Sequence, residues 1–157
     1  MSESKYGKYI ITERQLDSRD IALPPGVDPA SLSDTPSHFK LMSLDNVVLK
    51  GSPYCEVVWM WPAGSEVYPE TAEPESHAHE FDETLGFFGT DWEHPYDLGG
   101  EVELWIEDEK FLLTKSCLIF IPKGTHHCPL VIHKVDRPIF HFSTGPGGAY
   151  AQEVGEK

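Results

Sequence analysis

Short apolar or alternating runs, separated by turn residues, follow one another from about residue 40 to residue 145. The runs cover residues 46–50, 54–61, 83–88, 101–107, 110–115, 117–121, 127–134 and 138–143. Runs of this length, bounded by Gly, Pro, Asn and Asp, are typical of β-strands joined by turns. No segment keeps a 3.6-residue period and no internal repeat is present. The pattern therefore predicts an all-β domain with little helix.

One pair of runs predicts a β-hairpin with a solvent-facing side. Val102, Leu104 and Ile106 alternate with Glu and Trp residues, and a corner at Asp108 leads the chain into residues 110–115. A strand that alternates in this way places its apolar side chains on the core and its polar side chains in water.

The first 40 residues have a different character. They are polar, and the prolines of Pro24-Pro25-Gly26 and Asp34-Thr35-Pro36 interrupt regular elements. We expect a partly irregular N-terminal arm over residues 1–40, a barrel domain over 41–145 and a loosely held tail over 146–157. The apolar stretch 9–12 could add a strand to this domain or to a neighbouring subunit, and together with exposed sheet edges it predicts a homodimer.

Composition narrows the classes of function. The 157 residues suffice for one domain with a buried core, and 39% hydrophobic and 11% aromatic residues exclude a disordered chain. Because 12 Lys and Arg stand against 26 Asp and Glu, the net charge of -14 repels nucleic acids and anionic membranes, so we expect neither as a partner. No signal peptide or apolar run of about 18 residues is evident, which predicts a cytoplasmic protein.

Candidate chemistry lies in two histidine-containing stretches. In the first, His77, His79 and Glu83 share one parity, so on an extended strand their side chains point into one cavity, with Phe81 between them. The second stretch, 122–127, begins with a Pro-x-Gly turn that can bring His127 beside the first three residues.

Three imidazoles and one carboxylate form a ligand set for one divalent transition metal, namely Fe, Mn, Zn, Ni, Co or Cu, and suit Ca or Mg poorly. His126 is an alternative fourth ligand, since it precedes His127 directly; the spacing favours His127. His141 and Glu80 are candidate catalytic residues that would move a proton if their side chains reach an open position on the metal.

The pairing of HxHxxxE at residues 77–83 with PxGxxH at residues 122–127 resembles the cupin superfamily. The resemblance covers about residues 54–144 and implies a small jelly-roll barrel, a double-stranded β-helix, with one metal in its interior. It also implies that His77, His79, Glu83 and His127 are the metal ligands. Thr71, Ser116 and Val131 stand where the cupin motifs usually carry glycine, glycine and asparagine, so the turns around the motifs depart from the pattern while the ligand positions are kept.

What the resemblance implies for function is a metalloenzyme acting on a small oxygenated organic molecule, of dioxygenase, decarboxylase, isomerase or lyase type. A wall of aromatic side chains, with about half of them pointing inward, would suit such a partly apolar substrate. The alternative is a non-catalytic small-molecule-binding or regulatory cupin whose metal is structural or absent. A metal-free sugar epimerase would need basic residues for a nucleotide diphosphate, and the scarcity of Lys and Arg argues against it.

Overall fold

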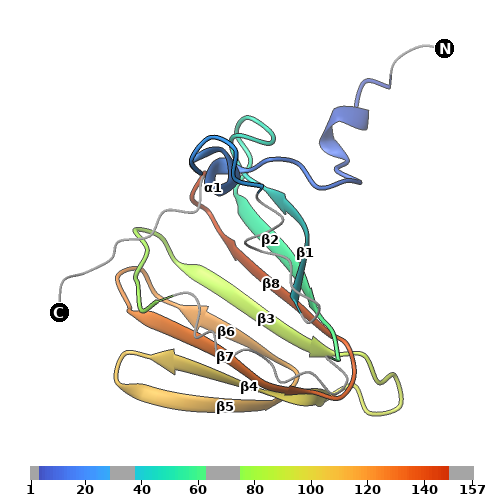
Figure 1. Ribbon diagram of the computed structural model, residues 1–157, viewed down its shortest axis with the longest axis vertical. Helices are drawn as coiled ribbons and strands as arrows, with labels where there is room; N and C mark the ends of the chain where they lie inside the picture. The colour runs from blue at the N-terminus through green and yellow to red at the C-terminus, as the bar shows by residue number, and fades with distance from the viewer. Residues whose placement is uncertain (1–3, 29–37, 63–74, 149–157) are drawn as a thin grey trace.

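Two antiparallel β-sheets face each other in the computed structural model, which describes residues 4–28, 38–62 and 75–148 (Figure 1). The five-stranded sheet has the order β1-β2-β8-β3-β6 and the three-stranded sheet the order β5-β4-β7. The strands are β1 (His38–Leu44), β2 (Tyr54–Met60), β3 (Glu83–Gly89), β4 (Asp97–Ile106), β5 (Glu109–Lys115), β6 (Cys117–Ile121), β7 (His127–Val135) and β8 (Ile139–Gly145). The two short helices are η1 (Gly7–Tyr9) and α1 (Ser18–Ile21).

The connections between the sheets define a double-stranded β-helix. The chain passes from β3 in one sheet to β4 in the other, and it returns from β7 to β8 along the same route in the opposite direction. β3 pairs with β8 and β4 pairs with β7, so one antiparallel ribbon winds through both sheets. This arrangement is a jelly roll, and the predicted all-β barrel is confirmed.

The apolar core lies between the sheets and draws on strands of both. Phe87 and Ile139 on the five-stranded sheet and Leu98, Val102 and Leu104 on β4 are fully buried. Val102 and Leu104 are inward-facing residues of the predicted hairpin, whose turn lies at Glu107 and Asp108. Burial of this apolar surface supplies the main driving force that holds the sheets together.

Two parts of the strand prediction are wrong. Residues 46–50 form turns instead of a strand, because the Asp45 carboxylate accepts hydrogen bonds from the backbone N–H of Val47 (2.8 Å) and Val48 (3.0 Å). A strand, β1, instead begins at His38, inside the predicted arm. β4 begins at Asp97, four residues earlier than the alternation suggested.

Residues 4–28 of the arm form no strand. Tyr9 is the last residue of the 3-10 helix η1 and residues 10–12 follow it, and Tyr9 and Ile10 are exposed. The predicted interruption at Asp34-Thr35-Pro36 and most of the predicted tail lie outside the described residues. None of the described helices has the length and apolar character that crossing a membrane requires.

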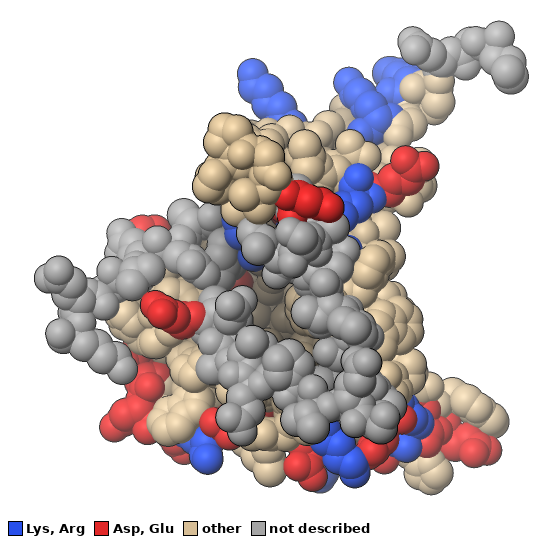
Figure 2. All heavy atoms as spheres, viewed as in Figure 1, with Lys and Arg blue, Asp and Glu red and all other residues tan. Residues whose placement is uncertain are grey.

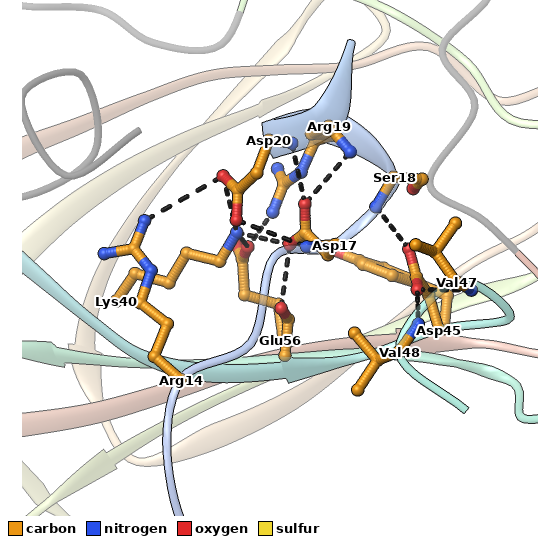
Figure 3. A network of polar contacts seen from close by, with 12 residues as sticks. Arg14, Asp17, Ser18, Arg19, Asp20, Lys40, Asp45, Val47, Val48 and Glu56 are labelled. Atoms are coloured by element: carbon orange, nitrogen blue, oxygen red, sulfur yellow. Dashed lines mark hydrogen bonds and ion pairs between the residues drawn. The ribbon is translucent and has the colours of Figure 1, made fainter. Parts of the chain in front are cut away.

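A buried polar network docks the arm on the five-stranded sheet (Figure 3). Asp17 caps α1 through the backbone N–H of Arg19 and Asp20, and its other oxygen contacts the Lys40 ammonium and the Ser43 hydroxyl. Lys40 also lies 3.2 Å from the Glu56 carboxylate. A register shift between Lys40 and Met42 turns both Lys40 and Ser43 to the inner face of the sheet, where alternation alone would separate them.

Asp17→Ala should lower the free energy of unfolding by about 3 kcal/mol, because it removes the helix cap and leaves the buried Lys40 ammonium short of a partner. Urea denaturation measures this change. The matched control is Asp136→Ala, which breaks an exposed ion pair with Lys134 and should leave the unfolding free energy within error. Similar losses in the two variants would contradict a structural role for the network.

Candidate metal centre

The two histidine-containing stretches are joined by backbone hydrogen bonds. His77 and His127 form an isolated antiparallel bridge, with N–H to O distances of 3.0 and 2.9 Å. Gly124, in the Pro-x-Gly turn, donates its N–H to the His79 carbonyl at 2.9 Å. Gly124 has a φ of 77°, a conformation that favours glycine and lets the turn lie against the first stretch. Backbone hydrogen bonds alone therefore hold the two stretches in register.

The first stretch does not lie on one continuous strand, contrary to the parity argument. Outside the bridge at His77, the backbone bends at Glu80 and Phe81, and β3 begins only at Glu83. His77, His79 and Glu83 nevertheless turn inward, because the bends bring Glu83 back to the side of the two histidines. All three side chains are almost fully buried.

The four residues surround one small volume. The ring centroids of His77, His79 and His127 lie 4.5 to 5.1 Å from one another. Glu83 Oε2 lies 3.0 Å from His127 Nε2 and 3.4 Å from His79 Nε2. His79, Glu83 and His127 each offer a ligand atom within 4.8 Å of the others. His77 belongs, with His127 and Cys128, to a second group of this kind, so the structure brings the four side chains of the motifs together as two groups that share His127.

Backbone carbonyls orient two of the imidazoles. His77 Nδ1 lies 2.6 Å from the Glu75 carbonyl oxygen, and His127 Nδ1 lies 3.2 Å from the Thr125 carbonyl oxygen. A ring nitrogen that faces a carbonyl carries the proton, so Nε2 of a neutral ring keeps its lone pair. This is the arrangement by which proteins commonly fix histidine ligands of metals.

Protonation states at neutral pH suit a cation. Burial raises the pKa of Glu83, but the contacts with His127 and His79 outweigh it and lower the pKa to about 2. Burial lowers the pKa of His77 to about 4. The cluster therefore contains an ionised carboxylate and a neutral imidazole, the forms that bind metals.

Glu83 Oε2 is the atom that most clearly suits a bound cation. It is fully buried, and among the described residues no donor is oriented to hydrogen-bond with it, despite the short distances to the two histidines. An ionised oxygen in this position costs free energy unless a positive charge compensates it. Nitrogen and oxygen donors in these numbers suit first-row transition metals.

Cys128 is a neighbour of the cluster that the sequence did not indicate. Its Sγ lies within 4.8 Å of a ligand atom of His77 and of His127. Adjacent residues of a regular strand point to opposite faces, but Cys128 has a φ of 71° and lies where the β4–β7 register shifts. Burial raises the pKa of its thiol to about 12, so without a metal it stays protonated. Only the local backbone reveals its position.

His126 points away from the cluster. It is half-buried and borders a surface cleft together with Ser76, Trp105 and Glu107, and its backbone N–H donates to Glu107 Oε1 at 2.8 Å. Its neighbour His127 is the buried member of the pair.

The two candidate proton-transfer residues occupy different places. Glu80 is exposed, forms an ion pair with Lys123 at 2.5 Å and belongs to neither group of converging ligand atoms among the described residues. His141 is buried on β8, where its ring stacks on Phe87 at 4.2 Å and its Nδ1 lies 2.9 Å from the Gly86 carbonyl oxygen. It shares the barrel interior with Glu83 without belonging to the group of converging ligand atoms.

Among the described residues, few aromatic side chains line the interior, and they fall short of the half that an aromatic wall would need. Tyr54 and Phe87 are buried inside, and Phe81 stacks on His79 with centroids 4.9 Å apart. The Tyr54 hydroxyl lies 2.5 Å from Ser143 Oγ, and burial raises its pKa. The strand register places five other aromatic residues on the outer face, namely Trp59, Phe88, Phe120, Phe140 and Phe142.

The His141 imidazole should remain neutral down to about pH 4, because burial lowers its pKa from 6.5 to about 4. Between these values the unfolded chain binds a proton that the folded chain excludes, so His141 makes the fold less stable as pH falls through this window. Nitrogen-15 NMR titration of the imidazole gives the midpoint directly. A midpoint near 6.5 in the folded protein, equal to that in urea, would contradict the burial argument.

No family model and no curated protein sequence matches the chain. Solved structures do resemble it. An uncharacterized conserved protein with a double-stranded beta-helix domain from Klebsiella pneumoniae is 14% identical, with 85% of this chain and 100% of that chain covered and a TM-score of 0.46. A DMSP lyase from Ruegeria pomeroyi is 21% identical, with coverages of 76% and 53% and a TM-score of 0.40.

A third similar structure is the hydroxypropylphosphonic acid epoxidase from S. wedmorenis in complex with fosfomycin. It is 17% identical, with 60% of this chain covered and a TM-score of 0.39, and the match spans only 43% of the epoxidase. Similarities of this size concern the fold alone. The antiparallel ribbon of β3, β4, β7 and β8, with the two histidine motifs meeting at one end of it, gives the chain a double-stranded β-helix fold.

Proposed function

We propose that the protein binds one divalent transition-metal ion through His77, His79, Glu83 and His127. The observation that carries this proposal is the buried Glu83 carboxylate, whose Oε2 faces His79 and His127 without a well-oriented hydrogen-bond donor among the described residues. The carbonyl contacts of His77 and His127 support it, because they leave Nε2 of each ring as the ligand atom. Cys128 lies close enough to join or replace a ligand, but its raised pKa favours the four residues of the motifs.

We propose further that the protein is a metalloenzyme that acts on a small oxygenated organic molecule. A metal bound by three imidazoles and one carboxylate keeps one or two positions open and supplies Lewis acidity or, if redox-active, reactivity with dioxygen. The chain itself would hold the four donor groups, exclude bulk water through their burial and offer a partly apolar wall of Tyr54, Phe81 and Phe87.

The polar groups of the interior support a small substrate. The Tyr54 hydroxyl and Ser143 form a buried pair on the inner face, within reach of the electrostatic influence of Glu83. Lys40, the buried cation on this face, is already engaged by Asp17 and Glu56. An interior with these groups suits a compact, weakly charged keto-enol, acid or phenol better than a phosphorylated compound. Dioxygenase, decarboxylase, isomerase and lyase chemistry all fit this description.

His77→Ala, Glu83→Gln and His127→Ala should each remove most of the bound metal and lower the melting temperature, because metal binding to the native state adds to its stability. Elemental analysis of anaerobically purified protein and thermal unfolding with and without a chelator measure both effects. His126→Ala is the matched control and should keep the metal content of the wild type.

Undiminished metal in Glu83→Gln and His127→Ala would contradict the assignment. Loss of metal in His126→Ala alone would indicate that His126, at the rim of the barrel, is the fourth ligand.

Turnover should depend on the metal if the protein is an enzyme. Oxygen uptake and decarboxylation by the metal-loaded protein, measured on a panel of keto acids and catechol-like compounds, should disappear on chelation and return with one metal. Binding of these compounds without turnover, by a fully loaded protein, would favour the alternative of a non-catalytic small-molecule-binding cupin.

A further inference from the structure

The outer face of the five-stranded sheet carries no charged side chain in three consecutive rows of residues. Cross-strand register defines the rows. The middle row runs across all five strands and consists of Met42, Val57, Phe142, Gly86 and Leu118. Along a strand of an antiparallel sheet, apolar residues normally face the core and polar residues face the solvent. A row on the solvent side is therefore normally polar.

The two flanking rows have the same character. One contains four aromatic residues, Phe39, Trp59, Phe140 and Phe88. The other ends in Phe120 and contains the only polar side chains of the three rows, those of Thr84 and Thr144. In a chain with 24% charged residues, the absence of charge from so many adjacent positions requires a physical reason.

Charges lie instead on the inner face of the same sheet, at Lys40, Glu56 and Glu83. The outer face of the three-stranded sheet shows the usual pattern, since Glu103 there lies 2.8 Å from His133 and 3.6 Å from Lys110. Most side chains of the three rows are half-buried, and Phe39, Leu118 and Phe120 are exposed. The five-stranded sheet therefore presents apolar residues on its outward side, and contiguous apolar surface of this kind marks an interaction site.

The aromatic rings of the outer face pack closely on the sheet and on one another. A Cβ at Gly86 would overlap the Phe142 ring, so the absence of a side chain at Gly86 lets this ring lie on the sheet. Phe142 stacks against Phe88 with centroids 6.1 Å apart, and Trp59 packs edge-on against Phe140 at 5.2 Å. In Figure 2, the flank beside β1 and β2 shows neither blue nor red between the charged groups above and below it. Leu118 and Phe120 on β6 remain 65% and 63% exposed.

The size of this face matches the needs of a dimer. Five strands about 4.8 Å apart, over about six residues at 3.3 Å each, give a flat area on the order of 500 Å² per copy. Two copies would bury on the order of 1,000 Å², which reaches the lower limit of a specific interface before the relief of the side chains is counted.

We propose that this face is the interface of a homodimer in which two copies pack their five-stranded sheets against each other. A second copy fits because the face is uncharged and can meet itself about a twofold axis, whereas other surfaces of a chain with a net charge of -14 would bring acidic groups together. Aligned packing of two twisted sheets about 10 Å apart is a common geometry for such faces. The dimer does not depend on the bound metal.

Leu118→Glu and Phe120→Glu test the proposal, because each places a charge on this face at a position exposed enough not to disturb folding. Leu112→Glu is the matched control: Leu112 is 56% exposed, and its pairing with Glu103 places it on the outer face of the other sheet. Sedimentation equilibrium gives the dimer dissociation constant of each variant, and circular dichroism confirms that each is folded.

The wild type should have the mass of two chains, each test variant should dissociate at least about tenfold more readily, and Leu112→Glu should match the wild type. A wild-type monomer at concentrations of about 100 μM would overturn the proposal. So would dimers of both test variants as tight as the wild type, or equal weakening by Leu112→Glu.

Discussion

Burial of an ionised carboxylate among imidazoles is the constraint on which the rest of this structure depends. Glu83 is the first residue of β3 and pairs with Ile121 of β6, and the next residue, Thr84, pairs with Thr144 of β8. Strand pairing therefore fixes the backbone at this end of β3. The turn at Gly124 and the bridge between His77 and His127 bring the imidazoles to it through the backbone. The free-energy cost of a buried charge is thus met by groups from segments that are about forty residues apart, which couples the site to the correct closure of the barrel.

The sequence predicted this site because spacing and residue type carry most of the information about it. The candidate ligand positions came from two short motifs. The strands from residue 83 onward came from alternation and turn residues, and most of their predicted ends differ from the observed ends by a few residues. Where tertiary or side-chain contacts override local pattern, prediction failed. The Asp45 carboxylate holds an apolar run in turns through hydrogen bonds to the backbone. The positive φ of Cys128 directs its own side chain toward the site. Whether an aromatic residue points inward or outward depends on the pairing between strands, which no single segment of sequence contains.

The five-stranded sheet reverses the usual distribution of polarity, and this explains the role of the N-terminal arm. Its inner face carries Lys40, Glu56, Tyr54, Ser143 and Glu83, which a purely apolar filling could not satisfy. At the end bearing Lys40 and Glu56, the arm supplies Asp17 and Arg19, so the buried charges are compensated by a segment outside the jelly roll (Figure 3). At the other end, the imidazoles of His79 and His127 lie beside the Glu83 carboxylate. An interior of this composition is stable only if both sets of polar groups are paired, which favours a specific arrangement over mere collapse.

The outer and inner faces of the five-stranded sheet share one backbone, because adjacent residues of a strand point to opposite faces. Phe142, on the proposed dimer face, lies between His141 and Ser143, which face the interior. Gly86, beneath the Phe142 ring, supplies the carbonyl that orients His141. A second copy packed on the outer rows would therefore restrain the same backbone that positions His141 and the Tyr54–Ser143 pair. In the proposed dimer, packing of the apolar outer faces would restrict movement of the strands whose inner side chains form the polar interior. The reversed polarity of the sheet would then stabilise the geometry of the interior.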